Sequence, residues 1–271
     1  TPDSRFLFSA GMDNLVHQWA VENWSLSQTY TGHEKSVNSI CLTSDGSRFI
    51  TASSDRSLRL WKPGDSDPLE ELSVKGSSAR LSKRDRFIAA IEGARVTLMD
   101  FETREEIKRF KSFPKRTNAL AFSPDEQMLA AGGQGDAIQF YNLPSCDQKH
   151  EISQAHERFV LSLGFSPDGR QLASTGYDQK LRIWNPEKWE PIEEIQLDNQ
   201  GVQSLTYSPD GAVIAVASDH RVTLVDADSV GIMQKLDLEP KGVYCLAFSP
   251  DGKWLACGSA DKRLRIWECL D

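Results

Sequence analysis

Short runs of hydrophobic residues alternate with polar turn residues along the whole chain. Between residues 32 and 61, three apolar runs are separated by the turn Ser44-Asp45-Gly46 and by the tighter turn Ser54-Asp55. Runs of about four to eight residues bounded by Gly, Pro, Asp and Ser are typical of antiparallel strands joined by short turns. The pattern predicts strands at residues 26–30, 37–42, 48–52 and 58–61.

The first of these turns has a clearer form in three later copies. They are Ser166-Pro-Asp-Gly169, Ser208-Pro-Asp-Gly211 and Ser249-Pro-Asp-Gly252. Ser at the first position, Pro at the second and Gly at the fourth suit a type I turn. We therefore expect a tight reversal at each copy.

The whole unit recurs seven times, and each copy ends on one anchor position. Clear copies run from Asp55 to Trp61, from Asp178 to Trp184 and from Asp261 to Trp267. One looser copy and three degenerate copies complete the set. The anchors are Trp19, Trp61, Met99, Tyr141, Trp184, Val225 and Trp267. A period of about 40–45 residues that ends on Trp is typical of four-stranded propeller blades. The repeat predicts one all-β domain over residues 1–271, a seven-bladed β-propeller with antiparallel blades.

The strand that opens each repeat contains an irregular step. Its apolar residues are Val37, Ile40 and Leu42 in one copy, and the first gap is three residues where alternation requires two. The copies that begin at Val160 and Val243 show the same gap. An extra residue in a strand is a β-bulge, which redirects side chains. We expect the residues that flank each Val to point toward the mouth of the central channel.

The chain resembles the WD40 repeat family over its whole length, on Gly32-His33, the Ser-Pro-Asp-Gly turns and the Asp…Trp endings. The resemblance implies a circular propeller in which each blade combines three strands of one repeat with the first strand of the next. It also implies a hydrogen-bonded tetrad of His, a hydroxyl residue, Asp and Trp. Two complete sets match: His33, Thr51, Asp55 and Trp61, and His156, Ser174, Asp178 and Trp184.

Some repeats depart from the family pattern. Gly93 and Gly135 replace the Asp in the blades that end at Met99 and Tyr141, and Cys257 replaces the hydroxyl in the last blade. The first turn, Thr1-Pro-Asp, already follows the inner strand of blade one, and the chain ends shortly after Trp267. We therefore expect an incomplete blade at the seam, in a chain cut from a longer protein.

Family members usually bind peptides or other proteins at the channel mouth. The residues that map there include Met12, Asn38, Arg116, Asn118, Phe159, Leu161, Tyr177, Gly201, Gln203 and Tyr244. Blade five places Phe159, Leu161 and Tyr177 together, and exposed apolar patches of this kind usually mark contact sites. The alternative is that these three side chains pack on neighbouring loops.

Composition narrows the choice of partner and compartment. The net charge of -8 and the pI near 5.2 oppose a general binder of nucleic-acid phosphates. Apolar runs stay below the ~18 residues of a membrane helix, and the N-terminal residues lack a signal layout. The five cysteines have no Cys-x-x-Cys spacing, which favours a reducing, cytoplasmic setting.

Ser174, His156 and Asp178 are also the residue types of a hydrolase triad. Because the same set recurs in another blade, we interpret it as a buried hydrogen-bond network and not as a catalytic site. His33 and His156 lie three blades apart, and the other histidines have no ligand spacing. We therefore expect no enzyme activity, cofactor, metal or small-molecule substrate.

The segment Lys108–Arg116 is the one basic cluster of this acidic chain. Either it contacts an acidic or phosphorylated partner, or its cations protect an outer strand from edge-to-edge pairing. The function that we predict is a scaffold that binds proteins or peptides at the channel mouth. The alternative is a regulatory or targeting module of a multidomain protein, such as a kinase-linked one, whose catalytic part lies outside this chain.

Overall fold

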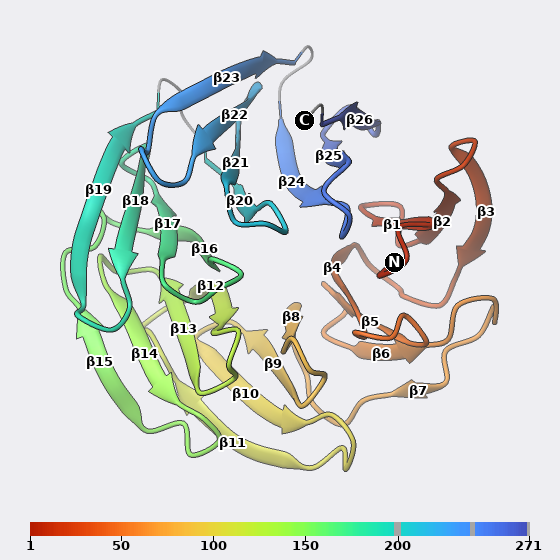
Figure 1. Ribbon diagram of the computed structural model, residues 1–271. Coiled ribbons are helices and arrows are strands. Elements are labelled where there is room, and N and C mark those ends of the chain that lie inside the picture. The colour runs from red at the N-terminus through yellow and green to blue at the C-terminus, as the bar shows by residue number, and fades with distance from the viewer. Residues whose placement is uncertain (198–201, 239–241, 270–271) are drawn as a thin grey trace. The chain divides into compact units, whose positions relative to one another are not determined.

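The chain folds into strands and turns, with no helix in the residues that the structure describes. The computed structural model describes residues 1–197, 202–238 and 242–269 (Figure 1). The strands form seven antiparallel sheets, each of which is one blade. The all-β, seven-bladed fold expected from the repeat is confirmed.

Each blade takes its strands from one consecutive stretch of sequence. The first four blades contain β1 (Phe6–Ala10), β2 (Val16–Ala20) and β3 (Ser25–Tyr30); β4 (Val37–Leu42), β5 (Phe49–Ser53), β6 (Leu58–Trp61) and β7 (Glu70–Glu71); β8 (Ser78–Leu81), β9 (Phe87–Glu92), β10 (Arg95–Asp100) and β11 (Glu106–Lys111); and β12 (Thr117–Phe122), β13 (Met128–Gly133), β14 (Ile138–Asn142) and β15 (Gln148–Ile152). The last three contain β16 (Val160–Phe165), β17 (Leu172–Gly176), β18 (Lys180–Asn185) and β19 (Glu190–Gln196); β20 (Ser204–Tyr207), β21 (Val213–Ser218), β22 (Arg221–Asp226) and β23 (Ile232–Asp237); and β24 (Val243–Phe248), β25 (Trp254–Ser259) and β26 (Leu264–Glu268).

All seven anchor residues lie in strands, as predicted. In each four-stranded blade the anchor belongs to the third strand, whereas Trp19 lies in the second of the three strands of blade one. The predicted strands 37–42 and 58–61 match β4 and β6, and β5 begins one residue later than predicted. The shift arises because Arg48 closes the preceding turn, where its carbonyl accepts a hydrogen bond from Thr43 N at 2.9 Å.

The Ser-Pro-Asp-Gly turns close through their own backbone and side chains. Gly169 N donates to Ser166 O at 2.9 Å, and Gly169 has the positive φ of +78° that a residue without Cβ adopts easily. Ser166 Oγ donates to Asp168 Oδ1 at 2.6 Å and accepts from Gln171 N at 3.0 Å. The Ser and Asp of the repeated phrase therefore act within the turn itself.

The chain divides into two compact units. The first comprises Thr1–Thr117 and Leu143–Cys146, and the second comprises Asn118–Asn142 and Asp147–Asp271. Blades one to three belong to the first unit. Blades four to seven, apart from Thr117 and residues 143–146, belong to the second.

Burial follows the position of a strand within its blade. The second strand of blade two, β5, is buried at every residue, whereas the outer strand of blade five, β19, is exposed at all positions but Ile195. A strand with covered faces on both sides carries a continuous run of small and apolar residues, and an outer strand carries charges. This difference explains why Ser and Thr recur in the second strands without reaching solvent.

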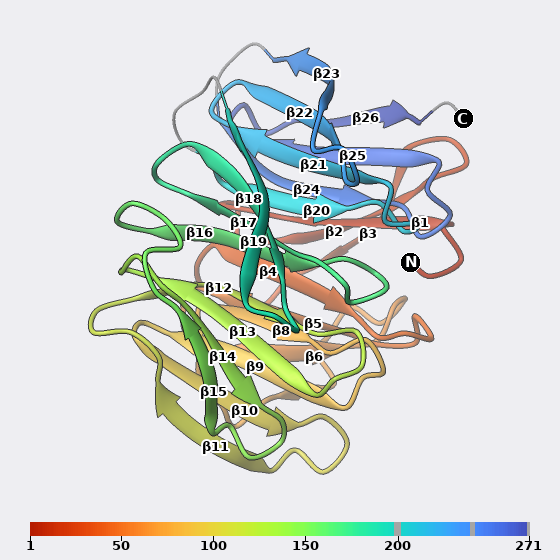
Figure 2. The ribbon, with the colours of Figure 1, turned by 60° about the vertical axis from the view of Figure 1, so that its left-hand side comes forward.

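Hydrophobic clusters join one blade to the next within each unit. In the first unit, Phe49 stacks on Trp61 at a centroid distance of 5.9 Å and meets Tyr30 edge-on at 5.0 Å. A comparable cluster joins blade five to blade six, which lie side by side in Figures 1 and 2. Packed apolar side chains therefore hold consecutive blades together.

Serine hydroxyls add a polar link between consecutive blades. Ser39 Oγ, on the inner strand of blade two, accepts a hydrogen bond from Ala79 N of blade three at 2.9 Å. Ser162 Oγ of blade five accepts from Leu205 N of blade six at 3.2 Å. An amide on the unpaired edge of an inner strand thus finds a side-chain acceptor on the preceding blade.

Candidate functional site

The inner strands contain the predicted bulges. The pairing register shifts between Val37 and Ser39, between Val160 and Ser162, and between Val243 and Cys245. The extra residues are Asn38, Leu161 and Tyr244, which the three-residue gaps had identified. The irregular apolar spacing was therefore a reliable signal of backbone geometry.

Phe159 and Tyr177 of blade five are held in contact by the backbone. Tyr177 N donates to Phe159 O at 2.9 Å, which ties the turn after β17 to the residue before β16. The preceding loop is fixed to blade four, because Gly135 N donates to Arg158 O at 3.0 Å. Two neighbouring blades therefore position this aromatic pair.

The side chains at this point form an exposed cluster. The rings of Phe159 and Tyr177 meet edge-on, with centroids 5.8 Å apart and planes at 85°. The guanidinium carbon of Arg158 lies 5.7 Å from the Tyr177 centroid, within cation–π range. Tyr177 is 55% exposed, and Phe159 and Leu161 are half-buried. We call Arg158, Phe159, Leu161 and Tyr177 the blade-five surface.

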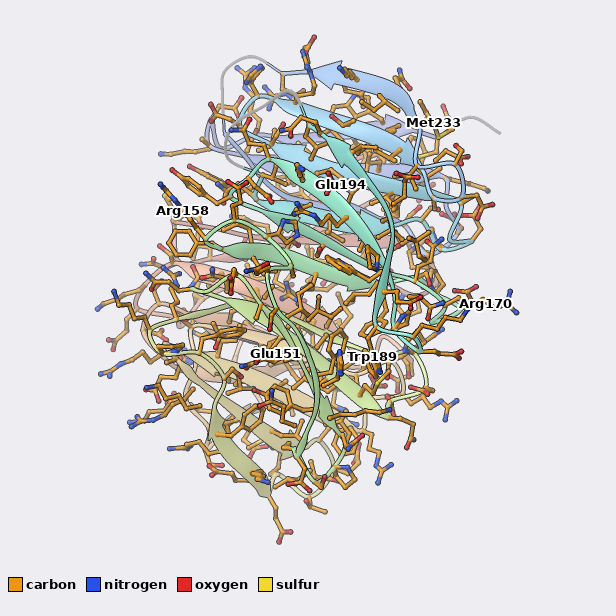
Figure 3. The ribbon with its side chains drawn as sticks, turned by 90° about the vertical axis from the view of Figure 1, so that its left-hand side faces the viewer. Glu151, Arg158, Arg170, Trp189, Glu194 and Met233 are labelled. Carbon is orange, nitrogen blue, oxygen red and sulfur yellow. The ribbon has the colours of Figure 1, made fainter. Side chains whose placement is uncertain are left out.

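Figure 3 shows where this surface lies in the second unit. Arg158 projects at one end of blade five, Arg170 projects at the opposite end, and Glu194 lies between them on the outer strand. Arg158 has a positive φ of 76° and directly precedes Phe159. Sequence reasoning missed Arg158, because only the fold brings it over the ring of Tyr177.

The two predicted asparagines use their amide groups inside the chain. Asn38 Nδ2 donates to Ser54 Oγ at 3.0 Å and to Ser77 O at 2.8 Å. Asn118 Nδ2 donates to Val160 O at 3.1 Å. Each amide thus links its own blade to the next. It is therefore less available to a partner than the predicted position at the channel mouth suggested.

The remaining predicted contact residues are exposed on separate blades. Met12 is 79% exposed in the first unit, where Arg116 is also exposed. Tyr244 is 51% exposed in the second unit. Gly201 lies outside the described residues. Of the predicted set, the structure brings Phe159 and Tyr177 into contact, and Leu161 follows on the bulge of β16.

The tetrad residues of blade two form one chain of hydrogen bonds. Trp61 Nε1 donates to Thr51 Oγ1 at 2.8 Å, and Thr51 Oγ1 lies 2.7 Å from His33 Nε2. His33 Nδ1 lies 2.9 Å from Asp55 Oδ2. These contacts fit a neutral imidazole that donates from Nδ1 to the carboxylate and accepts from the hydroxyl at Nε2.

Blade five repeats this chain with serine as the hydroxyl residue. His156 Nε2 lies 2.7 Å from Ser174 Oγ, His156 Nδ1 lies 2.8 Å from Asp178 Oδ1, and Trp184 Nε1 donates to Ser174 Oγ at 2.8 Å. A fifth member joins it, because Arg182 Nη1 donates to Asp178 Oδ2 at 2.6 Å. Each clear repeat has an arginine two residues before its Trp, so the sequence already contained the signal for this fifth member.

Burial and pairing set the charges of these groups. Burial lowers the pKa of His156 despite the opposing effect of Asp178, so the imidazole stays neutral. Burial acts to raise the pKa of Asp178, but hydrogen bonds from His156 and Arg182 outweigh it and lower the pKa below its ordinary value. The carboxylate is therefore ionised and paired with arginine.

The triad-like order of Ser174, His156 and Asp178 is enclosed. Ser174 is 0% exposed, and its hydroxyl already accepts a hydrogen bond from Trp184. A nucleophile must reach its substrate, and this hydroxyl reaches only protein atoms. The geometry therefore favours a structural role for the set.

The described residues offer little other chemistry. No group of three or more His, Cys, Asp or Glu in residues 1–197, 202–238 and 242–269 is placed to hold a metal ion. Within the same part of the chain, no helix has the length and apolar character needed to cross a bilayer.

Seven sheets, three of them with a bulged inner strand and two with a His–hydroxyl–Trp network, define a WD40-repeat β-propeller, which confirms the resemblance seen in the sequence. More specifically, a family model described as the WDHD1 first WD40 domain matches residues 30–270. The chain belongs to this family.

The chain is also similar to several curated proteins. Striatin-4 of Homo sapiens is 23% identical over 243 residues, which cover 79% of this chain and 32% of the relative. The small ribosomal subunit protein RACK1 of Neurospora crassa is 24% identical over 155 residues, or 53% and 49% of the two chains. The serine-threonine kinase receptor-associated protein of Gallus gallus is 26% identical over 145 residues, or 52% and 41%. The matched segments span less than half the length of these relatives.

Proposed function

We propose that this chain is a non-catalytic scaffold that binds a peptide or a protein loop at the blade-five surface. The observation that carries the proposal is the edge-to-face pair of Phe159 and Tyr177, in which Tyr177 is exposed, Phe159 is half-buried, and two blades fix the backbone. Tyr and Arg are the residue types that most often dominate binding energy at protein interfaces. WD40 propellers are generally scaffolds without enzyme activity, which supports the same function.

The rigidity of the pair favours binding. Association costs roughly 0.5–1.5 kcal/mol for each flexible side chain that becomes ordered. Phe159 and Tyr177 have few rotatable bonds and their backbones are hydrogen-bonded to each other, while the adjacent Arg158 is hydrogen-bonded to blade four. A partner therefore meets a preformed apolar platform with a cation at its edge. The chemistry that fits is an aromatic or aliphatic side chain followed by a carboxylate that reaches Arg158.

Peptide selection followed by mutagenesis tests this proposal. Random peptides displayed on phage would be selected on the immobilised chain, and the dissociation constants of enriched peptides would be measured by fluorescence anisotropy. Tyr177→Ala should weaken binding about 30-fold, which corresponds to the ~2 kcal/mol of an interface hot spot. Selected peptides should also contain aromatic or aliphatic residues.

The matched control uses exposed apolar residues on outer strands of the same unit. Met233 is 58% exposed on β23, and Ile192 is 47% exposed on β19 (Figure 3 labels Met233). Met233→Ala and Ile192→Ala should leave the dissociation constants within about twofold. Peptides that bind the Tyr177→Ala variant as tightly as the original chain would contradict the proposal.

A second candidate is a regulatory or targeting module of a larger, kinase-linked protein. It is supported by the name of the kinase receptor-associated relative and by the fraction of each relative that this chain spans. The coding sequence of the intact protein provides the test. A catalytic domain in the same polypeptide supports this candidate, and a polypeptide without one contradicts it.

We also propose a cytoplasmic location. All five cysteines are free thiols in the structure, which suits a reducing compartment. Microscopy of the intact protein fused to a fluorescent protein would test it, because signal confined to secretory compartments would be incompatible with the proposal.

A further inference from the structure

We propose that the first unit has a separate binding surface for an extended acidic peptide of a partner protein. The surface consists of six exposed cations, which we call the cationic surface: Arg56, Lys75, Arg95, Lys111, Lys115 and Arg116. It shares no residue with the blade-five surface, so each of the two proposals can fail without the other.

Backbone hydrogen bonds bring the loops of blades two and three to one place. Gly76 N donates to Arg56 O at 3.0 Å, which sets Lys75 beside the turn of blade two. The next residue continues the link into blade three, because Ser77 N donates to Ile91 O at 2.8 Å. The first two cations are therefore joined to the end of β9.

The other four cations gather around the turn between β9 and β10. Arg95 and Lys111 are direct partners across the β10–β11 pair. Thr117 N donates to Gly93 O at 2.8 Å, so the residues just before it, Lys115 and Arg116, return to the same turn. Segments that are distant in sequence thus present their cations together at one end of blade three.

These cations are not held in ion pairs within the described residues. The structure records no ion pair for any of the six, although other arginines of the same unit are paired. Arg48, for example, lies 3.0 Å from Glu102, and Arg104 lies 3.2 Å from Glu70. Two acidic residues lie in these segments: Glu92 is the cross-strand partner of Arg95, and Asp55 is already bonded in the tetrad of blade two.

An unpaired cationic cluster is unusual on this chain, whose net charge is -8. Like charges held together repel one another, and an anionic partner relieves that repulsion and is attracted to the cluster. The six residues lie in the turn after β5, in the loops before β8 and β12 and at the ends of β10 and β11, and all six are exposed. An extended row of carboxylates matches this spread better than a single phosphate group, which needs arginines converging on one point.

Nucleic acid fits this surface less well than an acidic peptide. Single-stranded nucleic acid usually needs exposed aromatic rings on which bases stack. Phe113 is the aromatic residue of the loop that carries Lys115 and Arg116, and it is only 3% exposed. The negative net charge of the whole chain also opposes a long polyphosphate.

Fluorescence anisotropy with defined probes tests the proposal. The main probe is a labelled peptide of alternating Glu and Ser, about 12 residues long, which reaches roughly 40 Å when extended. The comparison probes are the Gln version, a peptide of equal length with one phosphoserine, and oligothymidine. All are titrated with the whole chain at about 0.1 M salt, where the Debye length is ~10 Å, and again at about 1 M, where it is ~3 Å.

Two charge-reversal variants distinguish an effect of the cationic surface on binding from an effect of the chain's net charge. The first carries Lys75→Glu, Arg95→Glu and Arg116→Glu. The control carries Lys83→Glu, Lys188→Glu and Lys253→Glu, which change the net charge equally at exposed positions outside the cationic surface. Thermal melts of both variants confirm that each remains folded.

The Glu peptide should bind the original chain and the control within about twofold of each other, and it should bind the first variant at least tenfold more weakly. Binding should also weaken at high salt, and the Gln peptide should not bind. The proposal is overturned if the Glu peptide does not bind, or if both variants lose it equally. Tighter binding of oligothymidine or of the single phosphoserine peptide would likewise overturn the choice of partner.

Discussion

Replacing His156 by alanine should destabilise the chain by about 2–4 kcal/mol. The imidazole is buried, and its removal leaves the hydroxyl proton of Ser174 without its acceptor 2.7 Å away. An orphaned buried polar group costs about 1–3 kcal/mol, and the lost packing of the ring adds to it. Asp178 does not become an unpaired buried charge, because Arg182 still contacts it at 2.6 Å, and this spares the larger penalty of a broken ion pair.

Calorimetry and a double-mutant cycle measure this effect. For a chain of this size, about 2–4 °C of melting temperature is lost per kcal/mol, so His156→Ala should lower it by about 5–15 °C. Ser174→Ala should also destabilise, and the double variant should lose about 1–2 kcal/mol less than the sum of the two. Lys188→Ala, at an exposed turn, serves as the control.

Two results would refute this reasoning. If the His156→Ala variant had the same melting temperature as the Lys188→Ala control, the imidazole would have no structural role. If the free energies of His156→Ala and Ser174→Ala simply added, the two side chains would not act through their mutual hydrogen bond.

The other predictions concern pH, space and charge around the same network. Burial lowers the pKa of His33 and His156 below the ordinary histidine value of 6.5. Between that value and the lowered pKa, the unfolded chain binds more protons than the folded chain, so the free energy of unfolding should decrease as the pH falls through this window. The decrease should be smaller in a variant without both histidines. Gly176→Ala would place a Cβ atom 2.3 Å from the imidazole and should cost about 1–3 kcal/mol in urea unfolding, whereas Gly11→Ala, with no atom within 4 Å of its Cβ, should be nearly neutral. Arg182→Met removes the cation from the buried carboxylate 2.6 Å away, so acid unfolding monitored by circular dichroism should begin at a higher pH; an unchanged acid midpoint would contradict the pairing.

The parts of the structure that follow from local chemistry were predictable from the sequence. The Ser-Pro-Asp-Gly turns, the Trp anchors and the bulge after Val37 all depend on residues a few positions apart, and each appears where its pattern placed it. Even Val225, an anchor without an aromatic ring, lies in the third strand of its blade. The repeat period and the turn residues therefore predict most of the fold.

The candidate sites depended more on contacts between blades. Arg158 is 19 residues away from Tyr177, and no repeat pattern sets it over the ring. The amides of Asn38 and Asn118 were expected at a binding surface, yet they are engaged by backbone carbonyls of neighbouring blades. The cationic surface likewise draws on loops of two blades, while the basic cluster in the sequence contained only part of it.

The serine links between consecutive blades also bear on how the chain folds. Ser39 and Ala79 are 40 residues apart, and Ser162 and Leu205 are 43 apart. The entropic cost of closing a loop grows only with the logarithm of its length, so loops of nearly equal length have nearly equal costs of closure. A chain built this way can assemble one blade at a time, with every completed blade offering the next a preformed template. Hydrogen exchange should then protect the amides of Ala79 and Leu205 together with the blades that precede them.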